Sequence, residues 1–509
     1  MTGQSIYALF PYIILAGCAV AVMLAIAFHR RHSVAALMAM MGMTLAFLAL
    51  PLAASSAARQ VTPLLCVDNF ALFYTGLILI AGVVVAMLSY TYLEPRGNRN
   101  EEYYVLLLCA TLGAALMTAS THFISFFLAL EILSVSLYAM IAYPRVRDNA
   151  IEAAVKYLVL AAGSAAFLLF GMALVYAETG SMDFARIATL RNSLDQFENL
   201  ILLSGMALMI VGMGFKLALA PFHWWTPDVY EGAPAPVTAF VATVSKGAMF
   251  ALLLRFFARI DMHSYPPLFA LFAIIAVASM FTGNLLALLQ NNVKRILAYS
   301  SIAHLGYLLV AFLASGPLAA TAAAFYLVSY FLTTLTAFGV VTLMSSDNRP
   351  DKGLQPLVLS GADRDADSIE DYRGLMWRRP WIAMLFTTAL LSLAGIPLTA
   401  GFVGKFYILA AGEESARWIS VIMLVINSAI GLFYYLRIIV AMCAPIPEPA
   451  VSILIPPKEK KQMPLQPSPA LLAGVAISMV TLALVWFGVY PAPLIRLIES
   501  LVTGSAVLP

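Results

Sequence analysis

The sequence predicts an all-α polytopic membrane protein with about 14 transmembrane helices, which include two inverted five-helix repeats. Three observations support this fold class. Of the 509 residues, 62% are hydrophobic and only 11% are charged, and the mean hydropathy is +0.91, whereas soluble domains carry far more charge. Apolar stretches of about 20 residues, the length that crosses a bilayer core, recur along the chain. The two halves also share a spacing of residues that an internal repeat explains.

The predicted spans follow from apolar windows of about 20 residues. They are 7–28, 34–54, 69–92, 104–120, 122–142, 153–177, 200–224, 236–257, 268–290, 295–313, 318–344, 381–409, 417–442 and 470–491. The basic cluster at 29–32 follows the first span, which is the reverse of a cleavable signal peptide. We therefore expect the first span to remain as an anchor.

An internal repeat divides the chain. A shift of 169 residues sets Tyr138 on Tyr307 and Tyr157 on Tyr326. Each repeat unit holds five helices, an odd number, so the second copy must cross the membrane in the opposite sense. The predicted parts are helices one to three (1–100), the first repeat with helices four to eight (101–260), the second repeat with helices nine to thirteen (261–445), and a cytoplasmic linker with helix fourteen (446–509).

The distribution of lysine and arginine predicts the orientation. Loops that stay in the cytoplasm carry the excess of these residues. One side of the predicted topology collects Arg30, Arg31, Arg96, Arg99, Arg145, Arg147, Lys294, Arg295, the 345–380 loop, Lys458, Lys460 and Lys461. This assignment places both termini in the periplasm of a bacterium, with the chain spanning the inner membrane several times.

Four lysines, Lys156, Lys216, Lys246 and Lys405, lie inside otherwise apolar segments. Each one costs about 2.5 to 3.5 kcal/mol near the centre of a membrane helix, so such residues usually mark a charge pathway. Lys246 lies about ten residues into its helix, roughly 15 Å, too deep for its head group to reach water easily. Lys156 lies only a turn inside its helix, and snorkelling to the surface is the alternative for it.

Two of these lysines lie beside prolines within the predicted spans, Lys216 near Pro221 in helix seven and Lys405 near Pro397 in helix twelve. Proline removes a backbone donor and clashes with the preceding turn. Freed carbonyls at that depth are tolerated only when they are buried in protein or face a hydrated cavity. The pattern predicts one broken helix in each repeat, and a structural kink without a transport role is the alternative.

Glu131 lies some nine residues inside its predicted helix, where a carboxylate needs a partner. Lys216 is the candidate, because weakening such a pair would release the proton of the lysine; a static ion pair is the alternative. His304 could link the two halves, or it could be hydrogen-bonded scaffolding. The repeat sets Glu131 on Ser300, so the acid is present in one half only.

Several function classes are disfavoured. The net charge of +3 is small and the basic residues are scattered, which argues against a nucleic-acid partner. The four cysteines have no CxxC spacing and no glycine-rich nucleotide loop follows a strand. We therefore expect no metal site and no cofactor in this chain.

Three motifs carry a family resemblance. They are GFKLALAPFHWWTPDVYEGAP at 214–234, SKG at 245–247 and VKRILAYSSIAHLGY at 293–307. The chain resembles the proton-translocating membrane subunits of respiratory complex I and their relatives among the Mrp-type cation/proton antiporters, and the match covers helices four to thirteen. Within that group it most resembles the smallest antiporter-like subunit, because it has no long lateral helix and carries Lys405 where NuoM-type subunits are expected to carry glutamate.

This resemblance implies roles for the residues already named. Glu131 and Lys216 would form the modulating pair, Lys246 the central relay and Lys405 the terminal site, with His304 and Lys156 as further relay candidates. It also implies that NADH, FMN, iron–sulfur clusters and quinone belong to partner subunits, that neighbours of the NuoM and NuoK types flank the chain, and that protons and the lipid bilayer are its other partners.

Three alternatives remain open at the level of the sequence. The first is a Na⁺/H⁺ antiporter subunit of the Mrp type. The second is a non-conducting assembly subunit whose lysines only orient it against its neighbours. The third is the membrane subunit of a related hydrogenase or formate-linked complex, which would use the same fold.

Overall fold

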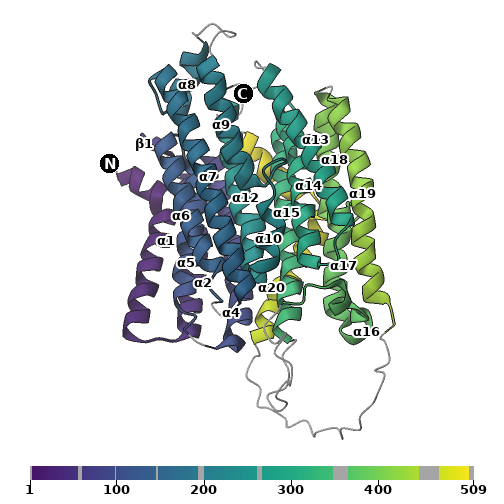
Figure 1. Ribbon diagram of the computed structural model, residues 1–509. Coiled ribbons are helices and arrows are strands. Elements are labelled where there is room, and N and C mark those ends of the chain that lie inside the picture. Colours follow the sequence, from purple (N-terminus) through teal and green to yellow (C-terminus); the bar gives the residue numbers. More distant parts are fainter. Residues whose placement is uncertain are drawn as a thin grey trace, which may run out of the picture.

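The computed structural model describes residues 3–55, 60–97, 99–144, 147–192, 200–260, 266–347, 365–415, 417–445 and 469–503. Within these ranges, 13 helices are long and apolar enough to cross a membrane. They overlap 13 of the predicted spans, which confirms the all-α polytopic fold class. In Figure 1 the long helices run side by side, with α1 (Gly3–Phe28) at one edge of the bundle and α19 (Trp418–Cys443) at the other.

The remaining elements follow in chain order. The N-terminal part contains α2 (His32–Leu48), α3 (Leu50–Ser55), β1 (Gln60–Thr62), β2 (Leu65–Cys66), α4 (Asn69–Leu93), η1 (Glu94–Arg96), α5 (Glu102–Ala119), α6 (Phe123–Ile141), α7 (Asp148–Thr179) and α8 (Phe184–Asn192). The middle contains α9 (Leu200–Leu217), α10 (Trp225–Gly232), α11 (Ala235–Phe240), the π-turn η2 (Val241–Ser245), α12 (Lys246–Ile260), α13 (Pro266–Leu288), α14 (Val293–Leu313) and α15 (Pro317–Asp347). The last part contains η4 (Ile369–Tyr372), α16 (Leu375–Arg378), α17 (Pro380–Ala394), α18 (Ala400–Glu414), α20 (Pro469–Val489), α21 (Ala492–Ile498) and the π-turn η5 (Glu499–Thr503).

Both predicted breaks are present in the backbone. The predicted twelfth span, 381–409, is divided into α17 and α18, and the seventh ends as a helix at Leu217. Ala218 and Leu398 have φ values of +59° and +71°, a left-handed conformation that residues other than glycine rarely adopt. The left-handed residue therefore lies two residues after Lys216 in the first break and seven residues before Lys405 in the second.

Side chains at the helix starts explain several boundaries. The Asp68 carboxylate accepts a 2.8 Å hydrogen bond from the backbone N–H of Ala71 at the start of α4. Asn292 accepts a 3.1 Å bond from the N–H of Arg295 at the start of α14. Both satisfy backbone donors that have no partner in the first turn of a helix.

The short elements are absent from the span prediction. They include α8, α10, α16, α21 and the antiparallel pair β1–β2. None of them contains an apolar stretch of about 20 residues, so a membrane-length window does not detect them. They lie between the long helices or after the last one and complete the connections.

Three spans form the centre of the bundle. Every residue in the most apolar window of Ala235–Ile260 and of α14 is buried, as are nearly all in that of α15. These spans carry Lys246, His304, Tyr307, Tyr326 and Tyr330, so the central part of the candidate site lies where lipid cannot reach. The predicted linker at 446–468, with Lys458, Lys460 and Lys461, and positions 348–364 of the 345–380 loop lie outside the described residues.

Candidate functional site

Lys216 lies at the penultimate position of α9, directly before the break. Its side chain is 5% exposed, and its ammonium group donates hydrogen bonds to the hydroxyls of Ser134, at 2.7 Å, and Tyr157, at 3.4 Å. It also lies 5.1 Å from the ring centre of Tyr157 and 5.9 Å from that of Tyr138. Aromatic faces attract a cation, so these rings replace part of the lost hydration.

The direct ion pair expected between Glu131 and Lys216 is not formed among the described residues. Glu131 lies on α6 and is partly exposed. Ser134, one helical turn further along α6, takes the hydrogen bond of the lysine instead. Glu131 is nevertheless close enough for its charge to act on Lys216 through space. Whether this carboxylate modulates the lysine therefore remains a prediction.

Lys246 is the first residue of α12 after the π-turn η2. π-turns inside helices add a residue to the turn and are frequent at functional sites. The Lys246 side chain is 1% exposed. Its ammonium group donates a 2.6 Å hydrogen bond to the Ser301 hydroxyl on α14 and lies 5.2 Å from the ring centre of Tyr230.

Ser301 and His304 lie one turn apart on α14 and connect to two tyrosines of α15. The hydroxyls of Ser301 and Tyr330 are 2.7 Å apart. Nδ1 of His304 is 2.6 Å from the hydroxyl of Tyr326. The rings of His304 and Tyr330 have centres 5.7 Å apart. Two hydrogen-bonded pairs, Ser301 with Tyr330 and His304 with Tyr326, thus lie between Lys246 and the second half, and the neighbouring rings of Tyr330 and His304 bring them together.

His304 also reaches toward the second broken helix. Its Nε2 lies 3.2 Å from the hydroxyl of Tyr435 on α19, and its ring centre lies 5.3 Å from that of Tyr307. The ammonium group of Lys405 lies 5.1 Å from the centre of the same Tyr307 ring. His304 therefore lies between the Lys246 group and the Lys405 group, as expected for a link between the halves.

Lys405, 6% exposed, caps the end of the first half of the broken helix. Its ammonium group donates to the carbonyls of Leu393, at 2.9 Å, and Ala394, at 3.0 Å, and to the hydroxyl of Ser428, at 2.8 Å. The last carbonyls of a helix have no partner within it and carry its negative dipole end, so they favour a cation. The break itself thus creates the binding position for this lysine.

Lys156 lies apart from the other three lysines. Its side chain is 45% exposed and forms ion pairs with Glu152, at 2.7 Å, and Asp228, at 3.0 Å. It borders an open polar cavity of about 190 Å³ that is also lined by Glu231 and Asn149. This placement agrees with the snorkelling alternative, and a relay role for Lys156 remains a prediction.

Comparison with known proteins identifies the family. Residues 120–431 match the family described as NADH:quinone oxidoreductase/Mrp antiporter, TM. The chain belongs to this antiporter-like family. A member from Nitrosospira multiformis named NADH-quinone oxidoreductase subunit N is 50% identical over 491 residues, which is 96% of this chain and 95% of the relative. The resemblance drawn from the motifs at 214–234, 245–247 and 293–307 is thereby confirmed.

Solved structures of the antiporter-like family share the fold. A chain of the respiratory complex I from Thermus thermophilus with bound aureothin has a TM-score of 0.75 and 32% identity, covering 96% of this chain and 98% of that one. A chain of the Mrp complex from Dietzia sp. DQ12-45-1b has a TM-score of 0.80 at 20% identity, covering 98% and 97%. The second likeness concerns the fold alone.

The hydroxyl groups that hold the buried lysines of this family member were not singled out by sequence reasoning. Serines such as Ser134 and Ser301 are common in membrane helices and carry no local signal. For the tyrosines a signal existed, because the 169-residue shift pairs Tyr138 with Tyr307 and Tyr157 with Tyr326. Tyr138 lies against Lys216 and Tyr307 against Lys405.

His223, quoted only as part of a motif, lies within the first break. It is buried and its ring stacks on that of Trp224, with centres 5.0 Å apart. Neither ring nitrogen has a hydrogen-bond partner within the described residues. A buried polar group of this kind usually binds water, so the break offers a place for an ordered water molecule at His223.

Proposed function

We propose that this chain is the proton-translocating membrane subunit of an NADH:quinone oxidoreductase. The observation that carries the proposal is the way three buried ammonium groups are held. Within the described residues, hydroxyl groups and backbone carbonyls hold Lys216, Lys246 and Lys405, and no carboxylate does. A buried lysine without a counter-ion is not locked in its charged form, so it can gain and lose a proton.

In the proposed path a proton enters from the cytoplasm near the first repeat and passes Lys216, Lys246 and His304 before it leaves through Lys405. Ser301, Tyr330 and Tyr326 would carry it between Lys246 and His304, since hydroxyl groups both donate and accept; within the described residues no hydrogen bond joins Tyr330 to Tyr326 or His304, so that step requires water. No hydrogen bond joins Lys216 to the Lys246 group within the described residues, so this step requires water or a side-chain movement.

The driving force would come from other subunits. Redox chemistry with NADH, FMN, iron–sulfur clusters and quinone would take place in those partners, and this chain would hold no redox cofactor. Electrostatic changes passed between neighbouring subunits of the NuoM and NuoK types would act on Glu131 and shift the balance at Lys216. The assembly would lie in the bacterial inner membrane with both termini of this chain in the periplasm.

The relatives favour this function over the other classes. The 50% identical relative is named as a subunit of NADH-quinone oxidoreductase, whereas the Mrp chain is 20% identical and supports only the fold. A Na⁺/H⁺ antiporter subunit of the Mrp type, a membrane subunit of a hydrogenase-like complex and a non-conducting assembly subunit therefore stay as outcomes that the following experiment can reveal.

The test uses the intact complex in sealed vesicles, with Lys246→Met as the variant. NADH-driven quinone reduction and proton uptake should both fall by at least about tenfold, because a positioned proton donor and acceptor is lost. Arg30→Met is the control, since it removes an exposed basic side chain that has no place in the proposed path, and it should stay within about twofold of the unchanged enzyme.

Three results would contradict the proposal. Proton uptake and quinone reduction at the rates of the unchanged enzyme in Lys246→Met would remove this lysine from the path. A lower yield of the complex with unchanged pumping per complex would indicate an assembly role. Dissipation of a pH gradient by Na⁺ without NADH would indicate an antiporter of the Mrp type.

A further inference from the structure

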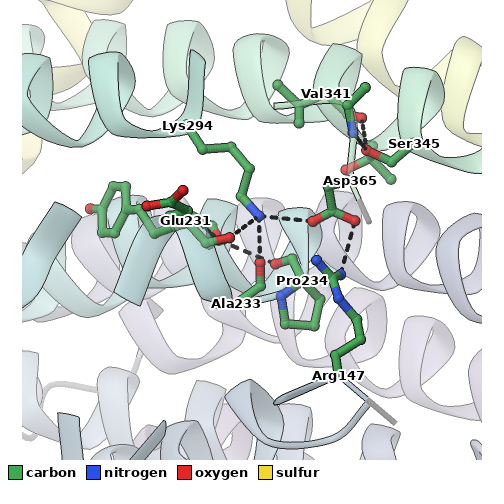
Figure 2. Close-up of polar contacts among 12 residues, drawn as sticks. Arg147, Glu231, Ala233, Pro234, Lys294, Val341, Ser345 and Asp365 are labelled. Carbon is green, nitrogen blue, oxygen red and sulfur yellow. Dashed lines mark hydrogen bonds and ion pairs between the residues drawn. The ribbon is translucent and has the colours of Figure 1, made fainter. Parts of the chain in front are cut away.

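A single buried carboxylate, that of Asp365, joins several separate parts of the chain (Figure 2). It accepts hydrogen bonds from the Tyr92 hydroxyl at 2.7 Å, from the Arg147 guanidinium at 3.0 Å and from the Lys294 ammonium at 2.8 Å. Arg96 lies 3.9 Å away. The side chains of Asp365 and Lys294 have no exposed surface.

Asp365 belongs to the connection between α15 and α17, and the backbone that follows it is hydrogen-bonded to the end of α15 and to the start of α14. The next N–H, of Ala366, donates to the Ser345 hydroxyl at the end of α15, at 3.0 Å. The carbonyl of Asp367 accepts from the N–H of Val293, and Ile369 donates to the carbonyl of Asn291 at 3.0 Å. The carboxylate is thus held by the backbone as well as by its ion pairs.

Lys294 connects Asp365 to the segment that precedes the helix of Lys246. Besides Asp365, its ammonium group donates to the carbonyls of Glu231 and Ala233, both at 2.7 Å, as Figure 2 shows. Those carbonyls lie at the end of α10, where helical partners run out. α11 begins two residues after Ala233 and continues through η2 into α12.

The same lysine fixes the start of α14, which carries Ser301. Lys294 is the second residue of α14. Asn292, the residue before this helix, donates from its side-chain amide to the carboxylate of Glu231 at 3.1 Å. The starts of the two helices that contribute Lys246 and Ser301 are therefore joined at one point. The 2.6 Å bond between Lys246 and Ser301 depends on how these two helices lie relative to each other.

The far part of the Lys246 helix is pinned as well. Arg255 forms two hydrogen bonds with Asp68 at the start of α4, at 3.0 and 2.6 Å, and a third with the carbonyl of Thr118 at 2.9 Å. Because Arg255 holds the far end, a loosening of the contacts at Lys294 would displace the segment between the two ends, which contains η2 and Lys246.

We propose that Asp365 is a positioning residue of the proton relay, which sets the alignment of Lys246 with Ser301 by holding Lys294 against the carbonyls of Glu231 and Ala233. The expected effect of Asp365 on proton pumping rests on the proposed function. The expected effect on the alignment of the helices does not. Asp365 does not itself carry the transported proton in this scheme, because it is sealed from the Lys246 group and saturated with donors.

The test compares intact complexes that carry Asp365→Asn, Tyr92→Phe or the control Glu370→Gln. Asparagine keeps the shape of Asp365 and removes its charge, so Lys294 and Arg147 lose their counter-ion. Tyr92→Phe removes one hydroxyl, which donates to Asp365 and accepts from Arg147, and it leaves the charge of Asp365 in place. Glu370 lies in the same connection, but its side chain is 72% exposed and its ion pair with Arg373 is long, at 3.4 Å.

The first measurement is backbone amide exchange in the segment 229–240, with the segment 403–412 of α18 as an internal reference. Asp365→Asn should speed exchange in the first segment by about tenfold and leave the reference unchanged, because the loosening is local. Tyr92→Phe should give a smaller change in the same segment, and Glu370→Gln none. Unchanged exchange at 229–240 in an assembled Asp365→Asn or Tyr92→Phe complex would overturn the proposal.

The second measurement is NADH-driven proton uptake by the same complexes. Asp365→Asn should slow it by about two- to tenfold, the range for residues that act through others, and Asp365→Glu should restore part of the rate. Faster exchange with full pumping would show that the contact is structural only and would also overturn the proposal. If Lys246→Met pumps normally as well, the proposed function fails, and that result is separate from the exchange data.

Discussion

The ammonium group of Lys246 and the hydroxyl of Ser301 are 2.6 Å apart, although 55 residues separate them in the chain. The same hydroxyl lies 2.7 Å from that of Tyr330. The Tyr230 hydroxyl lies 3.4 Å away, so Ser301 has three buried partners, and it lies one turn before His304 on α14. This serine connects the lysine of the first half to the polar centre of the second.

Replacing Ser301 with alanine should therefore interrupt proton transfer and lower stability. Lys246 and Tyr330 would both lose a buried partner, which costs about 1 to 3 kcal/mol per unsatisfied group. We expect NADH-driven proton uptake in vesicles to fall by up to about tenfold. Ser136→Ala is the control, because the hydroxyl of Ser136 bonds to the Ile132 carbonyl of its own helix. Equal rates in the two variants would contradict the role given to Ser301.

Gly395→Ala should displace Lys405. Gly395 has φ +86°, and a Cβ there would lie 2.9 Å from Cδ and 3.1 Å from Nζ of Lys405. A residue other than glycine in the left-handed region costs roughly 1 to 2 kcal/mol, before any clash is counted. The variant should lower both the dissociation temperature of the complex and the rate of proton uptake.

The matched control for that substitution is Gly474→Ala in α20. An added Cβ at Gly474 meets no atom within 4 Å, and alanine is favoured over glycine inside a helix by up to about 1 kcal/mol. This variant should be as stable as the unchanged complex or slightly more so. If Gly395→Ala behaves in the same way, the packing of Lys405 against the break is not required.

Asp367 gives the connection between α15 and α17 a dependence on pH. Burial is the main reason why the pKa of Asp367 is raised, to about 6; Lys294 and Arg147 act to lower it, and the neighbouring Asp365 acts to raise it. One of its oxygens is buried without a partner among the described residues. In the unfolded chain its pKa is about 3.9, so the folded state binds this proton more tightly.

Because the pKa of Asp367 is higher in the folded state, ionisation of its carboxyl lowers the free energy of unfolding. The contribution of the protonated group to stability is complete below about pH 4 and is lost as the pH rises through about 6. Asp367→Asn removes the ionisable group, so the variant should exceed the unchanged complex in dissociation temperature at pH 8 and show a clearly smaller advantage at pH 5. Thermal scans at both values test this. An advantage confined to pH 5 would contradict the assignment.

The Arg255–Asp68 pair should contribute more to stability than any exposed pair. The two side chains are 1% and 10% exposed. Breaking a buried pair by removing one partner costs about 3 to 5 kcal/mol, because the other charge stays buried and unpaired. Arg255→Gln should therefore lower the dissociation temperature strongly or reduce the yield of the complex.

The comparison for this prediction is Arg30→Gln. Arg30 pairs with Glu102 at 2.6 Å, but both side chains are nearly half exposed. Exposed pairs contribute about 0 to 1 kcal/mol. The two variants remove the same charge from the same type of pair, so similar thermal scans for both would show that burial does not set the strength of the Arg255 pair.

Local chemistry was sufficient to predict much of the fold. The length of an apolar stretch and the presence of proline are properties of a short segment, and they placed the spans and both breaks beside Lys216 and Lys405. The same reasoning placed Lys246 deep in its helix. It could not divide 236–257 at the π-turn η2, because a single extra residue per turn leaves no trace in hydropathy.

The sequence by itself therefore determined that this protein crosses a membrane, where its helices lie along the chain and which ionisable groups lie inside them. Only the tertiary structure decided which atoms bind those side chains. Ser134, and not Glu131, binds Lys216; the carbonyls of α17 bind Lys405; and Asp365 binds Lys294. The physical reason is that a hydrogen bond requires atoms within about 3 Å. The rotation and approach of helices far apart in the chain set that distance, and no local pattern encodes it.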